Sequence, residues 1–455
     1  MPNATSTSVL LASDLPSVLT EQPETSAELL PQMLQSLRRH IVSVPTEADD
    51  LRWIAPESDT DWAFFAWASD AASSALSSSE ANIGRHAEYY TLTEGRAIGI
   101  ATAAAELHSM FEAATSKVLE DDALLETFGI PAALHAKVKD SFVSHSSGVG
   151  QHSIMGRLDL AIDDHEVKVY EYNADSASCL YECGYAQERW ANAVGLEGSD
   201  PGPHLRSELT AAWRDAGIPA GAKLHLMLDD DLEEAYHARY VRDTVQEAGI
   251  RTKLIKGVEG MCWGPEGEVM DDEGERVQFV WKTWAWETVI DDYRSQTATH
   301  QHSQQRRVSL SDVLLSDGVT VWEPLWTVIT SSKAILPVLW QMFPGHPHLL
   351  QAEFELSTAL RNHPAGYVTK PIGGRCGKNV TMVKDGAVVA SLGGGFDAKP
   401  LVYQELWPLP RMDGFSVLMC PWLVRGKCAG LVLRVDKNLI TGVDSPTEVL
   451  RIVPL

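Results

Sequence analysis

The chain has 455 residues, of which 44% are hydrophobic and 22% are charged, and its formal net charge at pH 7 is −25. Such a length exceeds one ordinary core, so we expect two or three lobes of a soluble globular protein. The acidic balance argues against sequence-independent nucleic-acid binding, which depends on lysine and arginine side chains that neutralise phosphates. It favours cationic partners, although a role in solubility alone is the simpler explanation.

The N-terminal third of the chain is predicted to be a flexible tail followed by helices. Residues 1–28 are rich in Ser, Thr and Pro and contain no Lys or Arg, which indicates a disordered tail rather than a signal or transit peptide. Apolar residues then recur with helical spacing over residues 26–44, 61–75 and 101–119. We therefore expect residues 29–150 to form an N-terminal helical region.

Residues 151–330 are predicted to form a central α/β region. It opens with strand periodicity over residues 152–175 and returns to helix over residues 182–194. A β-α-β unit typical of a parallel sheet follows, with a strand over residues 223–228, a helix over 232–248 and a strand over 252–255. Because ligands gather at the carboxyl ends of such strands, residues 229–234 are candidates for a binding site.

The rest of the chain is predicted to form an antiparallel lobe over residues 331–455. Before it, residues 260–280 indicate a hairpin insertion, and residues 296–307 indicate a polar loop in which His300 and His302 are solvated. The strands expected in the lobe cover residues 367–370, 380–383, 388–390, 402–405, 416–423 and 430–435.

Six cysteines occur without a CxxC pair or a regular spacing, so we expect reduced thiols rather than a disulfide scaffold or a metal cluster. The chain also lacks an apolar run of about 18 residues, which argues against a membrane span. The cytoplasm is the default location.

The most informative segment is a predicted hairpin with polar groups on one face. Because side chains alternate along a strand, Glu171 and Asn173 are expected to share a face with Val167 and Val169, and Asp159 can lie opposite them on the preceding strand. Two carboxylates and an amide oxygen suit Mg²⁺ that carries nucleotide phosphates. A solvated hairpin with a satisfied polar face is the alternative.

A lysine followed by a glycine-rich loop is a second candidate for phosphate binding. Lys370 stands directly before the run from Pro371 to Gly377, and such a loop lets backbone N–H groups approach phosphate oxygens. An exposed lysine beside a plain hairpin turn is the alternative.

Five sequence motifs lie at residues 168–179, 281–288, 323–337, 370–377 and 403–407. Their order resembles that of the glutathionylspermidine synthetases, a branch of the ATP-grasp carboxylate–amine ligases, and the resemblance covers roughly residues 55–445. The resemblance implies an α/β ATP-grasp fold with a parallel or mixed central sheet, an antiparallel ATP-binding lobe and an N-terminal helical layer. It also implies an ATP-dependent ligase that joins the glycine carboxylate of glutathione to an amine of spermidine through an acyl phosphate, as a homodimer.

The resemblance further implies roles for individual residues at the nucleotide end. The residues expected to bind ATP are Arg157, Lys333, Lys370, Arg375, Cys376, Gly377, Gln404, Glu405, Leu406, Trp407, Leu439 and Ile440. Asp159, Glu171 and Asn173 correspond to ligands of two Mg²⁺ ions, and Arg157 and Arg434 correspond to catalytic arginines that stabilise the transferring phosphoryl group. Core packing is the alternative for Leu439 and Ile440.

At the substrate end, Ser176, Ser178, Cys179 and Thr288 match positions that hold glutathione in the family. Glu233 and Glu234 match acidic residues at the polyamine end, although glutamates at a helix N-terminus also occur for reasons of the helix dipole. We do not expect Cys179 to be a nucleophile, because ligation through an acyl phosphate needs no thiol.

The chain departs from the family pattern at three places. Its first cysteine is Cys179, so we expect the synthetase part without the cysteine amidase that many relatives carry. Leu418 replaces a polar position that contacts the nucleotide, and Asp444 or Glu448 would have to stand in for an acidic amine-site residue. The alternatives are therefore a ligase of another peptide-like acid with another amine, or an inactive nucleotide-binding module.

Overall fold

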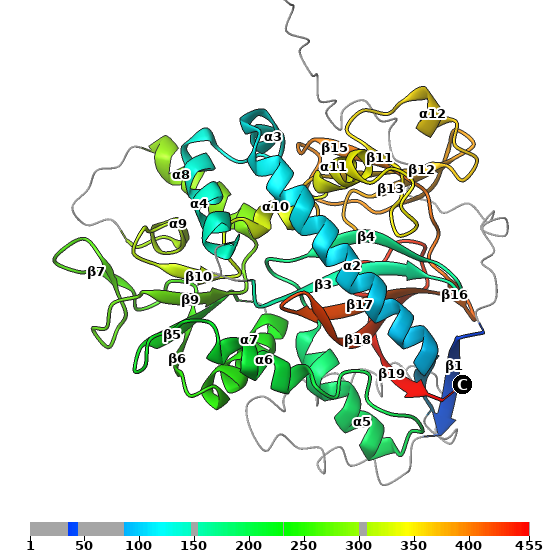
Figure 1. Cartoon of the computed structure of the whole chain (residues 1–455), viewed down its shortest axis with the longest axis horizontal. Coiled ribbons are helices and arrows are strands. Elements are labelled where there is room, and N and C mark those ends of the chain that lie inside the picture. Colours follow the sequence, from blue (N-terminus) through cyan, green and yellow to red (C-terminus); the bar gives the residue numbers. More distant parts are fainter. Residues whose placement is uncertain (1–34, 44–85, 147–152, 231, 300–306, 455) are drawn as a thin grey trace, which may run out of the picture.

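The computed structural model describes residues 35–43, 86–146, 153–230, 232–299 and 307–454 of the chain. In this part of the chain the strands form an eight-stranded mixed sheet, a four-stranded parallel sheet, a five-stranded antiparallel sheet and a two-stranded hairpin (Figure 1). The prediction of a mixed α/β fold is therefore confirmed. Within the same residues, every helix is too short or too polar to cross a lipid bilayer.

The eight-stranded sheet is the largest element of the fold and lies under a long helix, α2 (Glu94–Leu119) (Figure 1). Its strands are β1 (Leu37–Ser43), β2 (His86–Thr93), β19 (Thr447–Val453), β18 (Lys427–Asp436), β17 (Phe415–Val424), β3 (Met155–Ile162) and β4 (Val167–Asn173), with the short β16 (Arg411–Met412) beside β17. Ile100, Leu107, Phe111 and Val118 recur along α2 at helical spacing and are buried in the core against this sheet.

The structure corrects one secondary-structure prediction near the N-terminus. Residues 37–43, which were expected to end a helix, form β1 and pair with β2 along their whole length. The pairing partner is distant in sequence, so tertiary contacts override the local helical pattern. The predicted helix over residues 61–75 and the tail over residues 1–28 lie outside the described residues, whereas the helix over residues 101–119 is confirmed within α2.

The predicted β-α-β unit is confirmed. β5 (Lys223–Leu228) and β6 (Arg251–Lys256) are parallel neighbours joined by α7 (Leu232–Glu247), and β9 (Phe279–Lys282) and β10 (Thr320–Trp322) complete the four-stranded sheet. Because α7 begins where β5 ends, the acidic residues at its start lie at the carboxyl end of this sheet.

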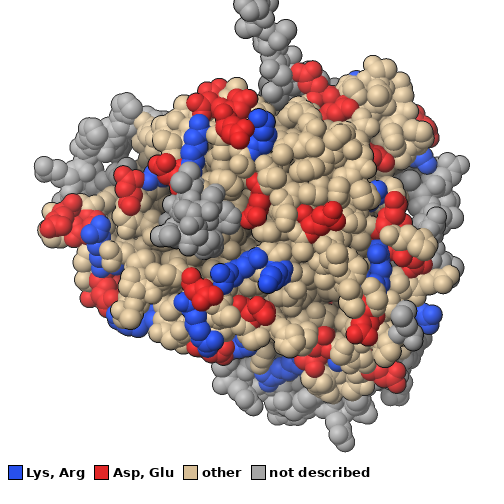
Figure 2. Space-filling view, viewed as in Figure 1, with Lys and Arg blue, Asp and Glu red and all other residues tan. Residues whose placement is uncertain are grey.

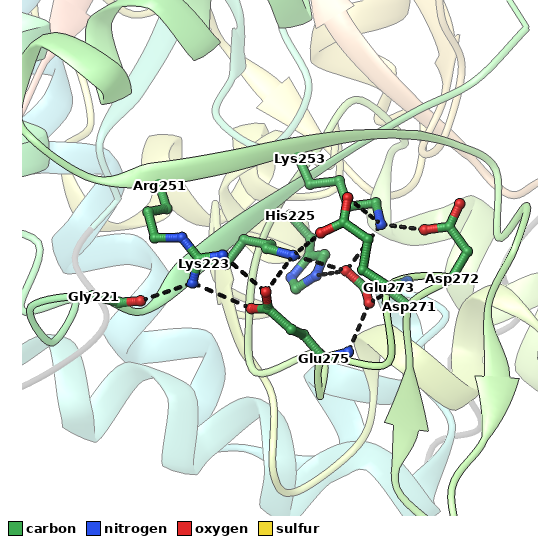
Figure 3. Close-up of polar contacts among 9 residues, drawn as sticks. All are labelled: Gly221, Lys223, His225, Arg251, Lys253, Asp271, Asp272, Glu273 and Glu275. Carbon is green, nitrogen blue, oxygen red and sulfur yellow. Dashed lines mark hydrogen bonds and ion pairs between the residues drawn. The ribbon is translucent and has the colours of Figure 1, made fainter.

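The expected hairpin insertion is present as β7 (Cys262–Trp263) and β8 (Val269–Met270). The turn that follows it is bound to β5 and β6 by a network of ion pairs (Figure 3). Asp271 lies at the centre of this network, where its carboxylate is 3.2 Å from the Lys223 ammonium and 3.1 Å from the Lys253 ammonium.

The five-stranded antiparallel sheet contains four of the strands predicted after Glu355. It consists of β11 (Ala352–Glu353), β15 (Leu401–Glu405), β12 (Tyr367–Pro371), β13 (Thr381–Lys384) and β14 (Ala387–Ser391). The strands predicted over residues 416–423 and 430–435 also form, as β17 and β18, but they pair next to β3 in the eight-stranded sheet. The C-terminal strands therefore belong with the hairpin β3–β4, and a lobe boundary at residue 331 stays a prediction.

Helices cover the sheets and connect them. They are α3 (Asp122–Thr127), η5 (Ala132–Leu134), α4 (His135–Ser146), η6 (Glu182–Ala186), α5 (Gln187–Val194), α6 (Leu205–Arg214), α8 (Trp286–Thr299), α9 (Leu310–Leu314), α10 (Thr327–Ser331), α11 (Ile335–Met342) and α12 (Thr358–Arg361). The polar loop predicted from Gln296 is helical as far as Thr299, and His300 and His302 lie outside the described residues. On the face shown in Figure 2, acidic side chains alternate with basic ones over the described residues, and no extended basic field is visible.

Candidate active site

A cleft with a volume of about 230 Å³ lies between the hairpin β3–β4 and the five-stranded sheet. This volume is slightly below the roughly 300–1,000 Å³ that small-molecule sites usually occupy. Many of its lining residues were singled out from the sequence. They are Arg157, Asp159, Glu171, Asn173, Ser176, Ser178, Glu234, Lys333, Lys370, Arg375, Cys376, Gly377, Gln404, Glu405, Trp407, Arg434, Leu439 and Ile440.

Three of the predicted site residues whose side chains are described, Cys179, Thr288 and Leu406, are not part of this lining. Leu406 is buried in a small apolar core next to the cleft. Cys179 follows Ser178 in the chain, but only Ser178 lines the cleft. Thr288 is exposed at the start of α8, and the side chain of Glu233 lies outside the described residues. Leu439 and Ile440 line the cleft and also pack against the core that contains Leu406. Their surroundings therefore fit both interpretations of the pair, ATP binding and core packing.

The oxygen ligands predicted for Mg²⁺ lie together on β3 and β4. Asp159 is the direct cross-strand partner of Glu171, and Arg157 is the partner of Asn173, so all four side chains are on one face of the sheet. Among the described residues, no group of three or more His, Cys, Asp or Glu is arranged to hold a metal. Two carboxylates and one amide suit Mg²⁺ only when phosphate oxygens and water complete its shell, which is the usual state of nucleotide-bound Mg²⁺.

The composition of that face differs from the prediction, because β4 contains a β-bulge. Asp159 pairs with Glu171, but the next residue, Leu160, pairs with Val169. The extra residue reverses the alternation, so Val169 packs in the core with Leu160 while Glu171 faces the cleft. Val167 lies in the same core. Strict alternation had predicted that Glu171 shares a face with the two valines. This prediction was wrong, because the bulge places Glu171 on the opposite face.

Arg157 is held in place by its predicted neighbours. Its guanidinium forms two bonds with the Asp159 carboxylate, with Nε 2.8 Å from Oδ1 and Nη2 3.1 Å from Oδ2. Nη1 donates to the Ser178 carbonyl at 2.8 Å. The side chains of Arg157 and Asp159 are both almost fully buried, so the pair keeps each charge compensated inside the protein.

Two lysines approach the hairpin from other elements. Lys333 lies in the turn between α10 and α11, and its ammonium is 2.8 Å from the Glu171 carboxylate. Burial alone would raise the pKa of Glu171, but Lys333, with help from Lys370, lowers it below the usual range. Lys370 is the penultimate residue of β12 and donates to the Gln404 side chain at 2.6 Å, while burial lowers its pKa to about 8. Glu171 and Lys370 thus line the same cleft, which is a requirement of the hypothesis that both bind one magnesium–nucleotide complex.

The position of Lys333 follows from its turn. Its backbone N–H donates to the Ile372 carbonyl at 2.9 Å, and the neighbouring Ser331 hydroxyl accepts from the Ala174 N–H at 2.9 Å. The turn is therefore fixed both to the end of β4 and to the beginning of the glycine-rich loop.

The glycine-rich loop closes one side of the cleft. Gly377 has a φ of +66°, and a Cβ there would lie 2.4 Å from the Thr441 carbonyl, so only glycine fits. The loop is tied down by Lys333, which donates to the Gly374 carbonyl at 2.5 Å. Arg375, expected near the nucleotide, donates to the Ser176 hydroxyl at 2.7 Å in this structure, so it reaches the substrate end of the cleft.

A buried aspartate that the sequence analysis did not single out organises the substrate end. Asp175 accepts a bond from the Trp286 N–H at the start of α8, at 2.9 Å, and its carbonyl accepts from the Lys282 ammonium at 3.1 Å. Arg375 lies 3.7 Å from the same carboxylate. Its position within the motif at residues 168–179 was a signal that Asp175 could be functional. The neighbouring residues, however, did not distinguish a buried aspartate from an exposed turn residue.

The remaining predictions concern β17, β18 and the thiols. Leu418 and Arg434 are cross-strand partners and both line the cleft, whereas Asp444 and Glu448 are not among its lining residues. All six cysteines lie in the described part of the chain and are free thiols. Burial raises the pKa of the Cys179 thiol, which agrees with the expectation that it is not a nucleophile.

Comparison with known proteins places the chain in a family. The model of the family described as "Glutathionylspermidine synthase preATP-grasp" matches residues 64–447. The bifunctional glutathionylspermidine synthetase/amidase of Escherichia coli (strain K12) is 40% identical over 375 residues, which cover 80% of this chain and 59% of that protein. Trypanothione synthetase of Crithidia fasciculata is 38% identical over 359 residues, which cover 76% of this chain and 54% of that protein.

The chain thus spans less than two thirds of the length of these relatives. A solved glutathione synthetase-like effector of Globodera pallida aligns over 90% of this chain and 100% of its own, with 13% identity and a TM-score of 0.45. From the match over residues 64–447, the chain belongs to the glutathionylspermidine synthase preATP-grasp family.

Proposed function

We propose that this protein is an ATP-grasp ligase that uses Mg-ATP to join the glycine carboxylate of glutathione to an amine of spermidine through an acyl phosphate. One observation carries the proposal: the oxygen ligands suited to Mg²⁺ and the two lysines suited to phosphates line a single cleft. Relatives named as glutathionylspermidine and trypanothione synthetases support it.

The chemistry requires charge compensation more than it requires a protein nucleophile. A carboxylate is a poor electrophile, so it must first be phosphorylated, and an amine then displaces the phosphate. Arg157, Lys333 and Lys370 would neutralise the phosphates and the developing oxyanion, which is the main contribution a protein makes to such transfers. Asp159, Glu171 and Asn173 would hold Mg²⁺, which would offset the negative charge of the phosphates.

The side chains of the cleft balance these charges among themselves. Asp159 is paired with Arg157 and Glu171 with Lys333, so each carboxylate proposed for the metal is neutralised by a cation proposed for the phosphates. Because Mg-ATP brings both signs of charge, it can take over both halves of each pair without leaving a buried charge uncompensated.

The glycine-rich loop would act as a flap. Closure over the nucleotide excludes water and so protects an acyl phosphate from hydrolysis. The bond between Arg375 and Ser176 joins the flap to the loop expected to hold the peptide acid. The amine would enter beside Glu234, which lines the cleft near Ser176 and can attract a cation and accept its proton.

Phosphate release from Mg-ATP, measured with glutathione and a panel of amines, tests the proposal. We expect release that needs both glutathione and spermidine, with a product whose mass equals the two substrates minus water. Release with glutathione and a different amine would replace spermidine only. An absence of release with every acid and amine pair would contradict the ligase and favour an inactive nucleotide-binding module.

A further inference from the structure

The β-bulge in β4 gives one tyrosine an unusual position. Asp159 pairs with Glu171 and Leu160 pairs with Val169, so Tyr170 is the extra residue between them and has no cross-strand partner of its own. Bulges next to active sites re-aim a side chain that strict alternation would send to the opposite face. Tyr170 lines the cleft, directly beside the metal-ligand candidate Glu171.

Tyr170 contacts the lysine proposed for the phosphates in two ways. The Lys370 ammonium lies 5.0 Å from the centre of the Tyr170 ring, which is a cation–π distance, and it also donates to the Tyr170 carbonyl at 3.4 Å. The Gln404 side chain provides the third contact, at 2.6 Å. Lys370 is therefore held by neutral groups on two sides.

The same tyrosine reaches residues 404–407, which the family resemblance implies hold the adenine base of ATP. The Tyr170 hydroxyl donates to the backbone carbonyl of Trp407. Lys168, two residues earlier on β4, places its ammonium 4.8 Å from the centre of the Trp407 ring and donates to the Pro347 carbonyl at 2.7 Å. Trp407 is thus attached to β4 through both its ring and its backbone.

We propose that Tyr170 is a positioning residue of the nucleotide site: its ring and carbonyl fix the Lys370 ammonium, its hydroxyl fixes the backbone at Trp407, and it thereby sets the spacing between the phosphate end and the base end. The proposal rests on the proposed function, since that function places the nucleotide in this cleft. It concerns binding rather than chemistry, so the effect belongs in the KM for ATP more than in kcat.

The charged groups around Lys370 define what the tyrosine adds. Glu171 and Asp159 favour the ammonium, whereas Lys333 and burial oppose it. The ring of Tyr170 supplies negative electron density without a full charge, so its removal shifts the balance towards the neutral amine.

Two substitutions separate the two contacts of the side chain. Tyr170→Phe removes only the hydroxyl that holds Trp407, and Tyr170→Leu removes the ring as well. Tyr172→Phe is the matched control, because Tyr172 lies on the same strand, is buried and has a hydroxyl 2.9 Å from a ring nitrogen of His108 on α2. The KM for ATP and kcat are measured for all three, together with the pH dependence of Lys370 labelling by an amine-reactive reagent, followed by mass spectrometry.

We expect Tyr170→Phe to raise the KM for ATP about fivefold, as for the loss of one neutral hydrogen bond, with kcat within about twofold of the wild type. Tyr170→Leu should raise KM further and move the midpoint of Lys370 labelling down by about one pH unit. Tyr172→Phe should leave both quantities unchanged.

An unchanged KM in Tyr170→Phe together with an unchanged labelling midpoint in Tyr170→Leu would overturn the positioning role while the ligase stands. If the wild type neither binds ATP nor forms an amide, the proposed function fails instead. Labelling of Lys370 then decides alone whether Tyr170 holds this ammonium, since that measurement needs no nucleotide.

Discussion

The Lys333 ammonium lies 2.8 Å from the Glu171 carboxylate, although one residue belongs to the turn before α11 and the other to β4. The contact joins a candidate phosphate ligand to a candidate metal ligand. Because both side chains are largely buried, neither charge can be removed without a cost to the other.

Lys333→Ala should therefore reduce both stability and activity. Removal of one partner of a buried ion pair costs about 3 kcal/mol of unfolding free energy, measured by urea denaturation at pH 7. The pKa of Glu171 is lowered in the folded protein, so this stabilisation is complete above its unfolded value of about 4.3 and is lost as the pH falls. The deficit of the variant should shrink accordingly below pH 4. Lys427→Ala, at an exposed lysine, is the control, and an equal loss in both variants would contradict the prediction.

Arg157→Ala should bind ATP yet barely turn over. The loss of one preorganised donor to an oxyanion costs on the order of 3 kcal/mol, so kcat should fall at least about 100-fold in the phosphate-release assay. Arg157→Lys keeps a positive charge beside Asp159 but loses the planar fork, so it should fold normally and still be slow. Near-normal kcat in either variant would remove Arg157 from the mechanism.

The pH profile should report Lys370. Burial lowers the pKa of this lysine to about 8, so its ammonium is present below that pH and is lost above it. We expect kcat/KM for ATP to fall as the pH rises through about 8, since this quantity reports groups of the free enzyme. Lys370→Arg keeps its charge at every accessible pH, and its profile should lack that fall even if its activity is lower. A fall that persists in Lys370→Arg would assign the titration to another group.

Asp271→Asn should destabilise the protein without altering the cleft. It removes a buried carboxylate from Lys223 and Lys253, which both keep Glu273 as a partner, so the loss should be about 2 kcal/mol in urea denaturation (Figure 3). Burial opposes the charge of Asp271, but hydrogen bonds from its own turn and from both lysines hold its pKa well below the usual range. The stabilisation is therefore present above about pH 4 and is lost on acidification. Asp272→Asn removes a much more exposed carboxylate that also contacts Lys253 and should have little effect.

Some of this site could be predicted from local pattern alone. The pairing of Asp159 with Glu171 followed from two short strands joined by a turn, and Lys370 was placed by the glycines after it. The motif at residues 323–337 added Lys333, whose contact with Glu171 joins residues far apart in sequence and has no local signature. The wider family resemblance added Arg434.

Other features could not be read from the sequence, because they depend on partners distant in the chain. The bulge at Tyr170 is a register shift, which alternation cannot show. The strand character of β1 depends on β2, and the neighbours of β17 were unknown until β3 was placed beside it. The bond from Arg375 to Ser176 likewise connects two loops that share no pattern.

Asp159, Glu171 and Arg434 are carried by one continuous sheet, whereas Lys370 is carried by another. Backbone hydrogen bonds between neighbouring strands set the spacing of the first three, whereas the spacing to Lys370 depends on side-chain contacts such as those with Tyr170. An inhibitor that contacts only Asp159, Glu171 and Arg434 should keep its affinity if the five-stranded sheet changes its position. One that also needs Lys370 would sense every change in the gap between the two sheets.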